Sequence, residues 1–202
     1  MLLRPDVVPR GLVTPDVRLE PLADEHTELD HTAYVSSPLA ITTHSAGRWP
    51  LEGFTVEEDR RLIAEHEREH RAGEAFAYAV LDRAGARQLG CLYVRPLTAQ
   101  LDRIDAPARV RESFVAPAAM VTFWLVDPPA PRPTVEAFVA VVLPWLRDRW
   151  PLGSWVFRCL PGEEETVRAL ASSRELTEAE LAPGGDGPPY RWFVPRPTEG
   201  AA

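Results

Sequence analysis

A strand, a proline-rich loop and an amphipathic helix constrain the fold of this chain more than any other segment. Residues Val121–Val126 form a mostly apolar run of strand length, and apolar residues recur at helical spacing after Thr134. The pattern predicts a buried strand that leads into a helix, whose free N-terminal N–H groups can hold an anion. The loop between them, residues 128–133, contains four prolines and no glycine. This segment therefore predicts the fold more firmly than the activity.

Composition bounds the size of the core and the classes of partner. The chain has 202 residues, of which 45% are hydrophobic, so it can bury a normal core in one large domain or two small ones. Its formal net charge of −8 argues against non-specific nucleic-acid binding and gives no positive footprint for a membrane. All 22 basic residues are arginine, which fits the coding bias of a GC-rich genome.

The sequence also suggests the cellular location of the protein and the redox state of its two cysteines. The first residues carry no long apolar run, which argues against a signal peptide, and the longest apolar stretch is too short for a bilayer. Cys91 and Cys159 match no zinc or redox spacing. We expect a cytoplasmic protein with two buried, reduced thiols.

The N-terminal half alternates between strand and helix patterns. Residues 16–22 alternate like a first strand, residues 23–36 keep apolar positions at helical spacing, and residues 37–54 look irregular. Thr55 and Glu58 then form a capping-box pattern. It predicts a helix that runs to about Arg71 and ends near Gly73.

The periodicity then changes from about 3.6 to 2. Residues 75–81 and 88–94 flank a turn-rich segment and predict a β-hairpin. Residues 95–117 suggest an extended loop or a small extra hairpin. Further strands are expected at 121–126, 154–160, 175–181 and 190–194, with helices at 134–150 and 163–173 and a disordered tail over 196–202. No linker divides the chain, so we expect a single α/β domain with a mixed central sheet and helices on both faces.

This layout resembles the GCN5-related N-acetyltransferase (GNAT) family over residues 12–195. Residues Phe76–Val80 and Leu89–Val94 are similar to the central hairpin of that family, whose second strand often begins with leucine or isoleucine and glycine. Val121–Pro128 is similar to the family's cofactor strand, which ends in valine-x-proline. The resemblance implies an acyltransferase domain that uses acetyl-CoA as co-substrate.

The resemblance also implies where acetyl-CoA would bind. In the family, the backbone of the cofactor strand pairs with pantetheine, which points to Leu125 and Val126. An arginine or glutamine followed by a glycine-rich loop then wraps the pyrophosphate. With Pro128 on the motif proline, Pro131, Thr134 and Glu136 take those positions; a shift by one residue gives Arg132, Val135 and Ala137.

We therefore predict cofactor contacts from six residues: Leu125, Val126, Arg132, Thr134, Val135 and Ala137. Each proline removes a donor that the phosphate would use, and Glu136 adds a negative charge to the first turn. Arg132 either contacts phosphate or is a solvated loop arginine.

The resemblance assigns neither a catalytic acid nor a base. The family's acid, where present, is a tyrosine on the helix after the fifth strand, and residues 162–173 contain no tyrosine. Catalytic residues are thus unassigned; transfer can proceed by positioning and a water-relayed proton. Family members bind the acceptor on the loop before the second helix, which points to Arg48, Trp49 and Phe54 as substrate contacts. Trp49 can equally be a lid over the core.

His66-Glu67-Arg68-Glu69-His70 matches the zinc-hydrolase pattern H-E-x-x-H. The intervening charges and the shared stripe with Leu62 and Ile63 favour packing at the edge of an amphipathic face instead. We predict no metal at this helix.

Three hypotheses remain. The first is an acetyl-CoA-dependent N-acyltransferase that acts by direct transfer on a small-molecule or peptide amine, with no nucleic-acid or membrane partner. The second is a non-catalytic GNAT-fold protein that binds a ligand or partner. The third is a zinc hydrolase built on residues 66–70.

Overall fold

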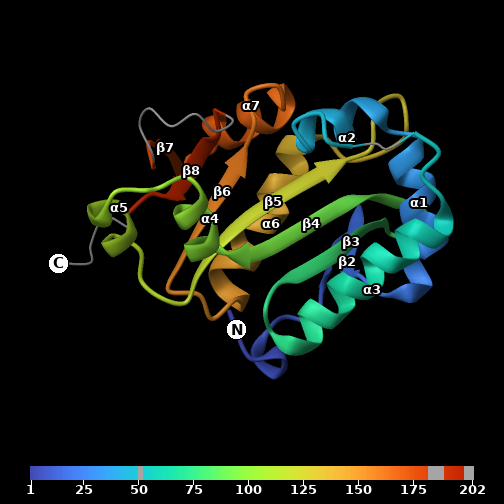
Figure 1. The fold of residues 1–202 in the computed structure, drawn as a ribbon. Helices are drawn as coiled ribbons and strands as arrows, with labels where there is room; N and C mark the ends of the chain where they lie inside the picture. Colours follow the sequence, from blue (N-terminus) through green and yellow to red (C-terminus); the bar gives the residue numbers. More distant parts are fainter. Residues whose placement is uncertain (50–51, 182–188, 198–202) are drawn as a thin grey trace.

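The computed structural model describes residues 1–49, 52–181 and 189–197 and contains one mixed sheet of eight strands (Figure 1). The strand order is β1-β2-β3-β4-β5-β6-β8-β7. The strands are β1 Leu12–Val13, β2 Val17–Pro21, β3 Phe76–Asp82, β4 Gln88–Pro96, β5 Ala118–Leu125, β6 Ser154–Cys159, β7 Leu176–Ala179 and β8 Arg191–Pro195. Only β5 and β6 pair in parallel; their neighbours pair antiparallel.

The α-helices are α1 Thr27–Val35, α2 Pro38–His44, α3 Val56–Ala72, α4 Leu97–Arg103, α5 Ala108–Glu112, α6 Val135–Arg149 and α7 Glu164–Ser172. Two 3₁₀ turns, Pro5–Val7 and Asp24–His26, precede them. The predicted single α/β domain is confirmed. None of the helices in the described ranges combines the length and the apolar character needed to cross a bilayer.

The centre of the sheet forms where the periodicity changes from helical to alternating. β3 and β4 make the predicted hairpin, with Phe76 opposite Val94 and a register shift between Val80 and Leu81. β4 then pairs with β5 from Gly90 opposite Leu125 to Pro96 opposite Ala119. Gly90 has φ of +150°, and a Cβ there would lie 1.9 Å from Trp124 O, so this close approach of β4 and β5 needs glycine.

The capping signals of α3 act as expected. Thr55 Oγ1 accepts the Glu58 N–H at 3.2 Å, and the Glu58 carboxylate accepts the Thr55 N–H at 2.8 Å. Gly73 ends the helix in the left-handed region with φ of +66°. Local hydrogen bonds and the left-handed glycine thus define both ends of this helix.

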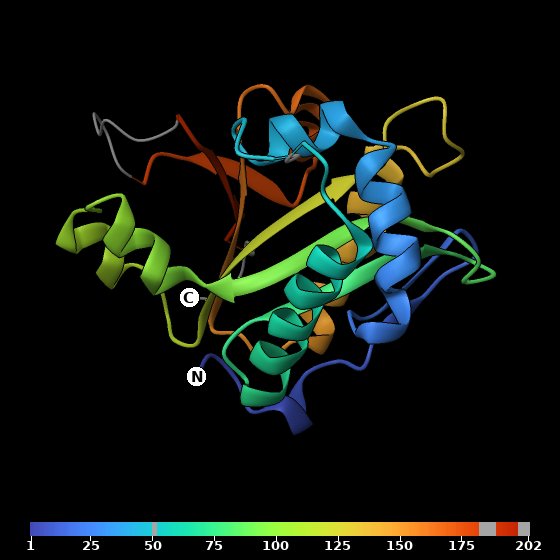
Figure 2. The same ribbon diagram turned by 45° about the vertical axis from the view of Figure 1, so that its right-hand side comes forward.

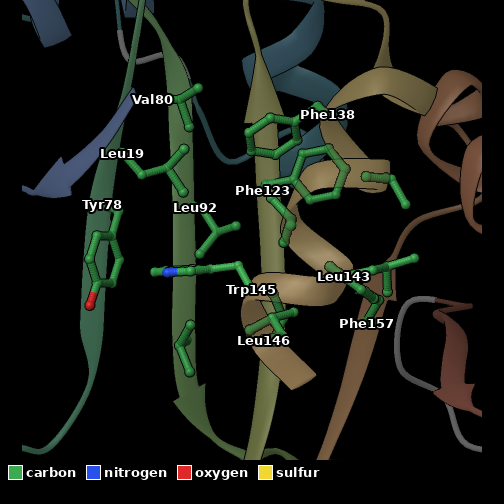
Figure 3. Close-up of a cluster of buried hydrophobic side chains, with 14 of the residues drawn as sticks. Leu19, Tyr78, Val80, Leu92, Phe123, Phe138, Leu143, Trp145, Leu146 and Phe157 are labelled. Carbon is green, nitrogen blue, oxygen red and sulfur yellow. The ribbon is translucent and has the colours of Figure 1, made fainter. Parts of the chain in front are cut away.

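Two apolar cores cover opposite faces of the sheet. One lies between the sheet and α6 with α7; Figure 3 shows Phe138 and Trp145 of this core beside Phe123 and Leu92. The other lies under α1, α2 and α3 and contains Ile41, Ile63 and Trp124. Odd-numbered residues of β5 thus face α6, and even-numbered residues face the other side, where Trp124 lies under α1–α3 and Met120 beside α4. The predicted helices on both faces are confirmed.

Two segments differ from the sequence prediction. Residues 38–44, expected to be irregular, form α2, which begins with proline at its first turn, where the missing N–H costs nothing. Residues 95–117, expected to be a loop or hairpin, form α4 and α5, which lie together beside the end of β4 (Figure 2). Leu97 and Leu101 of α4 are buried against Met120 and Val156, so tertiary packing stabilises helices too short for a clear periodic signal.

The tail prediction for residues 196–202 mostly concerns residues 198–202, which lie outside the described residues.

Candidate functional site

β5 and β6 separate halfway along their length and open one edge of β5. Their parallel pairing extends from Ala118 opposite Ser154 only to Val121 opposite Phe157. Figure 1 shows the two strands side by side at their starts and apart at their arrowheads. From Thr122 onward β5 keeps β4 as its one strand neighbour.

The backbone direction of β5 shows which residues face this opening. The Val126 N–H donates to Leu89 O at 2.9 Å, on the β4 side. Because N–H and C=O groups alternate in direction along a strand, the backbone groups of Leu125 and Phe123 point away from β4, toward the opening. Of the two predicted strand contacts, Leu125 is placed to pair with an extended ligand, whereas the Val126 N–H is already used.

Helix α6 begins just beyond the end of β5. Thr134 caps it, with its Oγ1 accepting the Ala137 N–H at 3.1 Å. The N–H groups of Val135 and Glu136 have no acceptor within the part of the chain that the structure describes, as is general for a first helical turn. Thr134 therefore acts as the cap, and two open donors remain beside it.

Arg132 is not a solvated loop arginine. Its Nε donates to Val126 O at 2.7 Å, and its two terminal nitrogens donate to Pro133 O at 3.1 Å and to Glu165 at 2.7 Å. Its side chain is only 11% exposed. The guanidinium thus ties the end of β5 to α7, and each of its nitrogens already has a protein acceptor.

A cavity of about 440 Å³ lies on the face of the sheet that α1–α3 cover, opposite the face that packs on α6. Its walls come from α1–α4 and from β4, β5 and β6. Met120, Thr122 and Trp124 form its floor on β5, along the stretch where β5 leaves β6. The cavity and the strand opening therefore meet along residues 122–125 of β5, where the side chains of Thr122 and Trp124 face the cavity and the backbone of Phe123 and Leu125 faces the opening. The cavity volume suits a small ligand.

Arg48 and Trp49, two of the three predicted acceptor contacts, line this cavity. Phe54 does not line it but packs against Trp49, with ring centroids 5.6 Å apart, and against Tyr34 at 4.8 Å. Trp49 also packs on the core under α1–α3, so it is both a lid over that core and part of the cavity wall.

The cavity lining includes a buried carboxyl pair, Asp30 and Asp59. Asp30 accepts hydrogen bonds from Gln88 and from the Cys91 thiol. Burial and the negative charge of Asp30 raise the pKa of Asp59 to about 8. Burial also raises the pKa of Asp30 and of the Cys91 thiol. Near neutral pH the pair therefore holds a proton, and Cys91 stays a thiol.

A second polar pair lies nearer the strand opening. His44 Nδ1 is 2.9 Å from Glu163 Oε1, and both side chains are largely buried. Glu163 also accepts the Leu160 N–H at 2.6 Å, which fixes its carboxylate. Nδ1–H donation to Glu163 leaves a lone pair on Nε2 of a histidine that lines the cavity. This geometry is that of a histidine oriented to accept a proton.

The two histidines of the H-E-x-x-H pattern contact aromatic rings. His70 packs edge-on against Phe76 with centroids 5.0 Å apart, and His66 lies 5.6 Å from the Tyr93 ring. The Glu67 carboxylate pairs with Arg71 at 2.8 Å. Within residues 1–49, 52–181 and 189–197, no group of three histidine, cysteine or acidic side chains is arranged to hold a metal ion.

Sequence reasoning missed four site residues: Asp30, Asp59, His44 and Glu163. Each is a single polar residue in a helix or at its start, and no motif joins them. Asp59 resembles an ordinary acidic residue of a first helical turn, and His44 and Glu163 are 119 positions apart.

Three solved structures similar to this chain are acetyltransferases. RimL, the ribosomal L7/L12 alpha-N-protein acetyltransferase in complex with coenzyme A, has a TM-score of 0.63 at 14% identity over 92% of this chain and 96% of its own. RimJ of Mycobacterium smegmatis, in complex with CoA-disulfide, has a TM-score of 0.60 at 14% identity over 91% and 84%. The microcin C7 self-immunity acetyltransferase MccE, in complex with acetyl-CoA and AMP, has a TM-score of 0.63 at 13% identity over 94% and 97%.

These identities show a shared fold. No family model matches the sequence, and no curated protein sequence matches it significantly.

Proposed function

We propose that this chain, which has the GCN5-related N-acetyltransferase fold, transfers an acetyl group from acetyl-CoA directly to an amine. The observation that carries the proposal is the opening beside β5. The same four residues, 122–125, offer unpaired backbone to one ligand and cavity-facing side chains to another. Two substrates can thus meet at one strand, as direct transfer requires.

The residues around the opening fit acetyl-CoA. Its pantetheine amides would pair with the backbone of Phe123 and Leu125, and its pyrophosphate would accept from the Val135 and Glu136 N–H groups at the positive end of α6. Thr134 and Ala137 hold this turn in place through the cap. Arg132 supports the site by fixing Val126 and the loop. The solved structures of RimL and MccE, which share the fold, contain coenzyme A and acetyl-CoA, respectively.

His44 would take the proton that the acceptor must lose. An ammonium group in the cavity gives its proton to Nε2 while Glu163 accepts the Nδ1–H. The freed amine lone pair attacks the thioester carbonyl, a C–N bond forms, and the C–S bond breaks. The nitrogen loses a second proton as it becomes the amide, and the departing thiolate takes up that proton to become the free thiol.

The acceptor is an amine of a small molecule or peptide, and the cytoplasmic location stays a prediction. RimL is an acetyltransferase of a ribosomal protein, which makes a peptide amine one candidate class.

Calorimetric titration of acetyl-CoA tests the proposal. Glu136→Pro removes one phosphate donor from the first helical turn, where proline is tolerated. Glu136→Ala is the matched control, because it removes the same charge but keeps the N–H. We expect saturable binding by the wild type, equal or tighter binding by Glu136→Ala, and binding about 5- to 10-fold weaker than that control for Glu136→Pro.

Circular dichroism of each variant checks that α6 is intact. No heat and no thermal shift with the wild type at millimolar acetyl-CoA would contradict the transferase function and favour a non-catalytic binding protein of the same fold.

A further inference from the structure

Three arginines line one end of the cavity without a carboxylate partner. Arg158 comes from β6, Arg48 from the segment after α2 and Arg103 from the end of α4. None of the three forms an ion pair with any residue that the structure describes. In a chain with 30 acidic and 22 basic residues, such a group of unpaired cations is unexpected.

Arg158 is the central member of the group. Its guanidinium stacks on Tyr190, with 4.6 Å from Cζ to the ring centroid, and its Nε is buried without a hydrogen-bond partner. An orphaned buried donor is costly, and a bound water or ion is one of the explanations for it. Burial lowers the pKa of Arg158, and the positive charges of Arg48 and Arg103 lower it further.

One carboxylate, Glu163, lies near enough to raise the pKa of Arg158. The Glu163 carboxylate does not form an ion pair with Arg158, because it accepts hydrogen bonds from His44 and from the Leu160 N–H. The cluster thus keeps an excess of positive charge that an anionic ligand would neutralise.

The position of Arg158 separates this anion site from the helix that would hold the pyrophosphate. Its neighbours Phe157 and Cys159 belong to the core on the α6 side of the sheet. Because side chains alternate along a strand, Arg158 projects to the opposite side, into the cavity that also contains His44. An anion held by Arg158 would therefore lie on the cavity side of the sheet, away from the N-terminus of α6.

We propose that the acceptor is a small amine that also carries a carboxylate or a phosphate, and that Arg158, with Arg48 and Arg103, binds this acidic group. The proposal rests on the proposed function and names the substrate class of the same site. The cavity volume of about 440 Å³ accommodates a molecule of this size. The arginines would hold the anionic end while the amine points toward His44.

Anion binding without acetyl-CoA gives the first test. Inorganic phosphate and succinate are titrated calorimetrically into the wild type, Arg158→Gln and Arg83→Gln, and the two anions distinguish phosphate from carboxylate. Arg83 is an exposed arginine on the turn between β3 and β4, so its replacement matches the change in net charge. We expect Arg158→Gln to weaken binding of at least one anion about 10- to 100-fold and Arg83→Gln to leave it unchanged.

Acetyl transfer to matched acceptors gives the second test. Phosphoethanolamine is compared with ethanolamine, and glycine with glycinamide. We expect the wild type to prefer an acidic member of a pair, and Arg158→Gln to lose that preference through KM while its Kd for acetyl-CoA is unchanged.

Anion binding that is the same in Arg158→Gln and the wild type would overturn the proposal, as would equal use of acidic and neutral acceptors. Arg158-dependent anion binding without transfer to any acceptor would overturn the proposed function and leave the anion site standing.

Discussion

At the scale of single residues, the chemistry depends on side chains that the fold brings together from distant positions. His44 ends α2, Glu163 precedes α7, and Arg158 comes from β6. Each alone has an ordinary structural explanation. Their shared place near β5 is what supports the proposed proton acceptor and the proposed anion site.

The His44–Glu163 pair gives a prediction about turnover. In Glu163→Gln, the amide oxygen can still accept the Leu160 N–H, but the amide nitrogen would donate to His44 Nδ1 and leave the proton on Nε2. A histidine in that tautomer cannot accept the proton of the acceptor. We expect kcat to fall about 10²- to 10⁴-fold in both Glu163→Gln and His44→Gln, with little change in the Kd of acetyl-CoA.

Steady-state kinetics at saturating acetyl-CoA provides the check, together with calorimetric titration of acetyl-CoA into each variant. Wild-type kcat in either variant would show that the pair is structural.

At the scale of elements, the close approach of β4 and β5 depends on Gly90. In Gly90→Ala the new Cβ meets Trp124 O at 1.9 Å, and the backbone also keeps a positive φ. Gly53→Ala is the matched control, because Gly53 has φ of +71° with nothing within 4 Å of the added Cβ.

We expect Gly53→Ala to lower the free energy of unfolding by about 1 kcal/mol and Gly90→Ala by at least about 3 kcal/mol. Urea denaturation followed by circular dichroism measures both. An equal decrease in the free energy of unfolding in both variants would contradict this prediction. It would mean that β4 and β5 move apart at no energetic cost and that only the positive φ at Gly90 matters.

Elements with a strong local signal were predictable from the sequence. The capping box and Gly73 marked α3, the change of period marked the β3–β4 hairpin, and the apolar run marked β5. α2, α4 and α5 gave no such signal, because five to seven residues are too few to show helical periodicity. Their stability comes from contacts with residues far away in the chain, such as Met120 for α4.

The site residues divide in the same way. The resemblance to the GNAT family pointed to Leu125, Val135, Arg48 and Trp49, because backbone edges and loops keep their place in a fold, and their roles stay predictions. Arg132 shows where prediction from the sequence ends. The sequence suggested that its side chain contacts either a phosphate or solvent, whereas in the structure it donates to the Val126 carbonyl and to Glu165. Side-chain partners across the sheet depend on packing that no local pattern encodes.

At the scale of the whole molecule, the buried carboxyl pair links stability to pH. The pKa of Asp59 is raised from 3.8 to about 8 in the folded state. The folded chain therefore holds a proton that the unfolded chain releases at lower pH, so stability must fall as pH rises through this window. The loss should be complete above about pH 8.

We expect the wild-type Tm to fall between pH 5 and pH 8 and Asp59→Asn to lose most of this fall, because its amide can donate to Asp30 at any pH. At pH 8 the variant should be more stable than the wild type by on the order of 1 kcal/mol. Differential scanning calorimetry measures both values, with Asp16→Asn, at an exposed position, as the control. Parallel pH profiles for the wild type and Asp59→Asn would exclude a proton shared by the pair.

The prolines between β5 and α6 affect the entropy of ligand binding. Each ring fixes φ, so residues 128–133 have little backbone freedom left to lose when a ligand is bound. A glycine-rich loop of the same length makes more hydrogen bonds to a phosphate but must first be ordered from many conformations. If the N-terminus of α6 binds a pyrophosphate as proposed, this loop would contribute fewer hydrogen bonds than a glycine-rich loop but would lose less conformational entropy on binding.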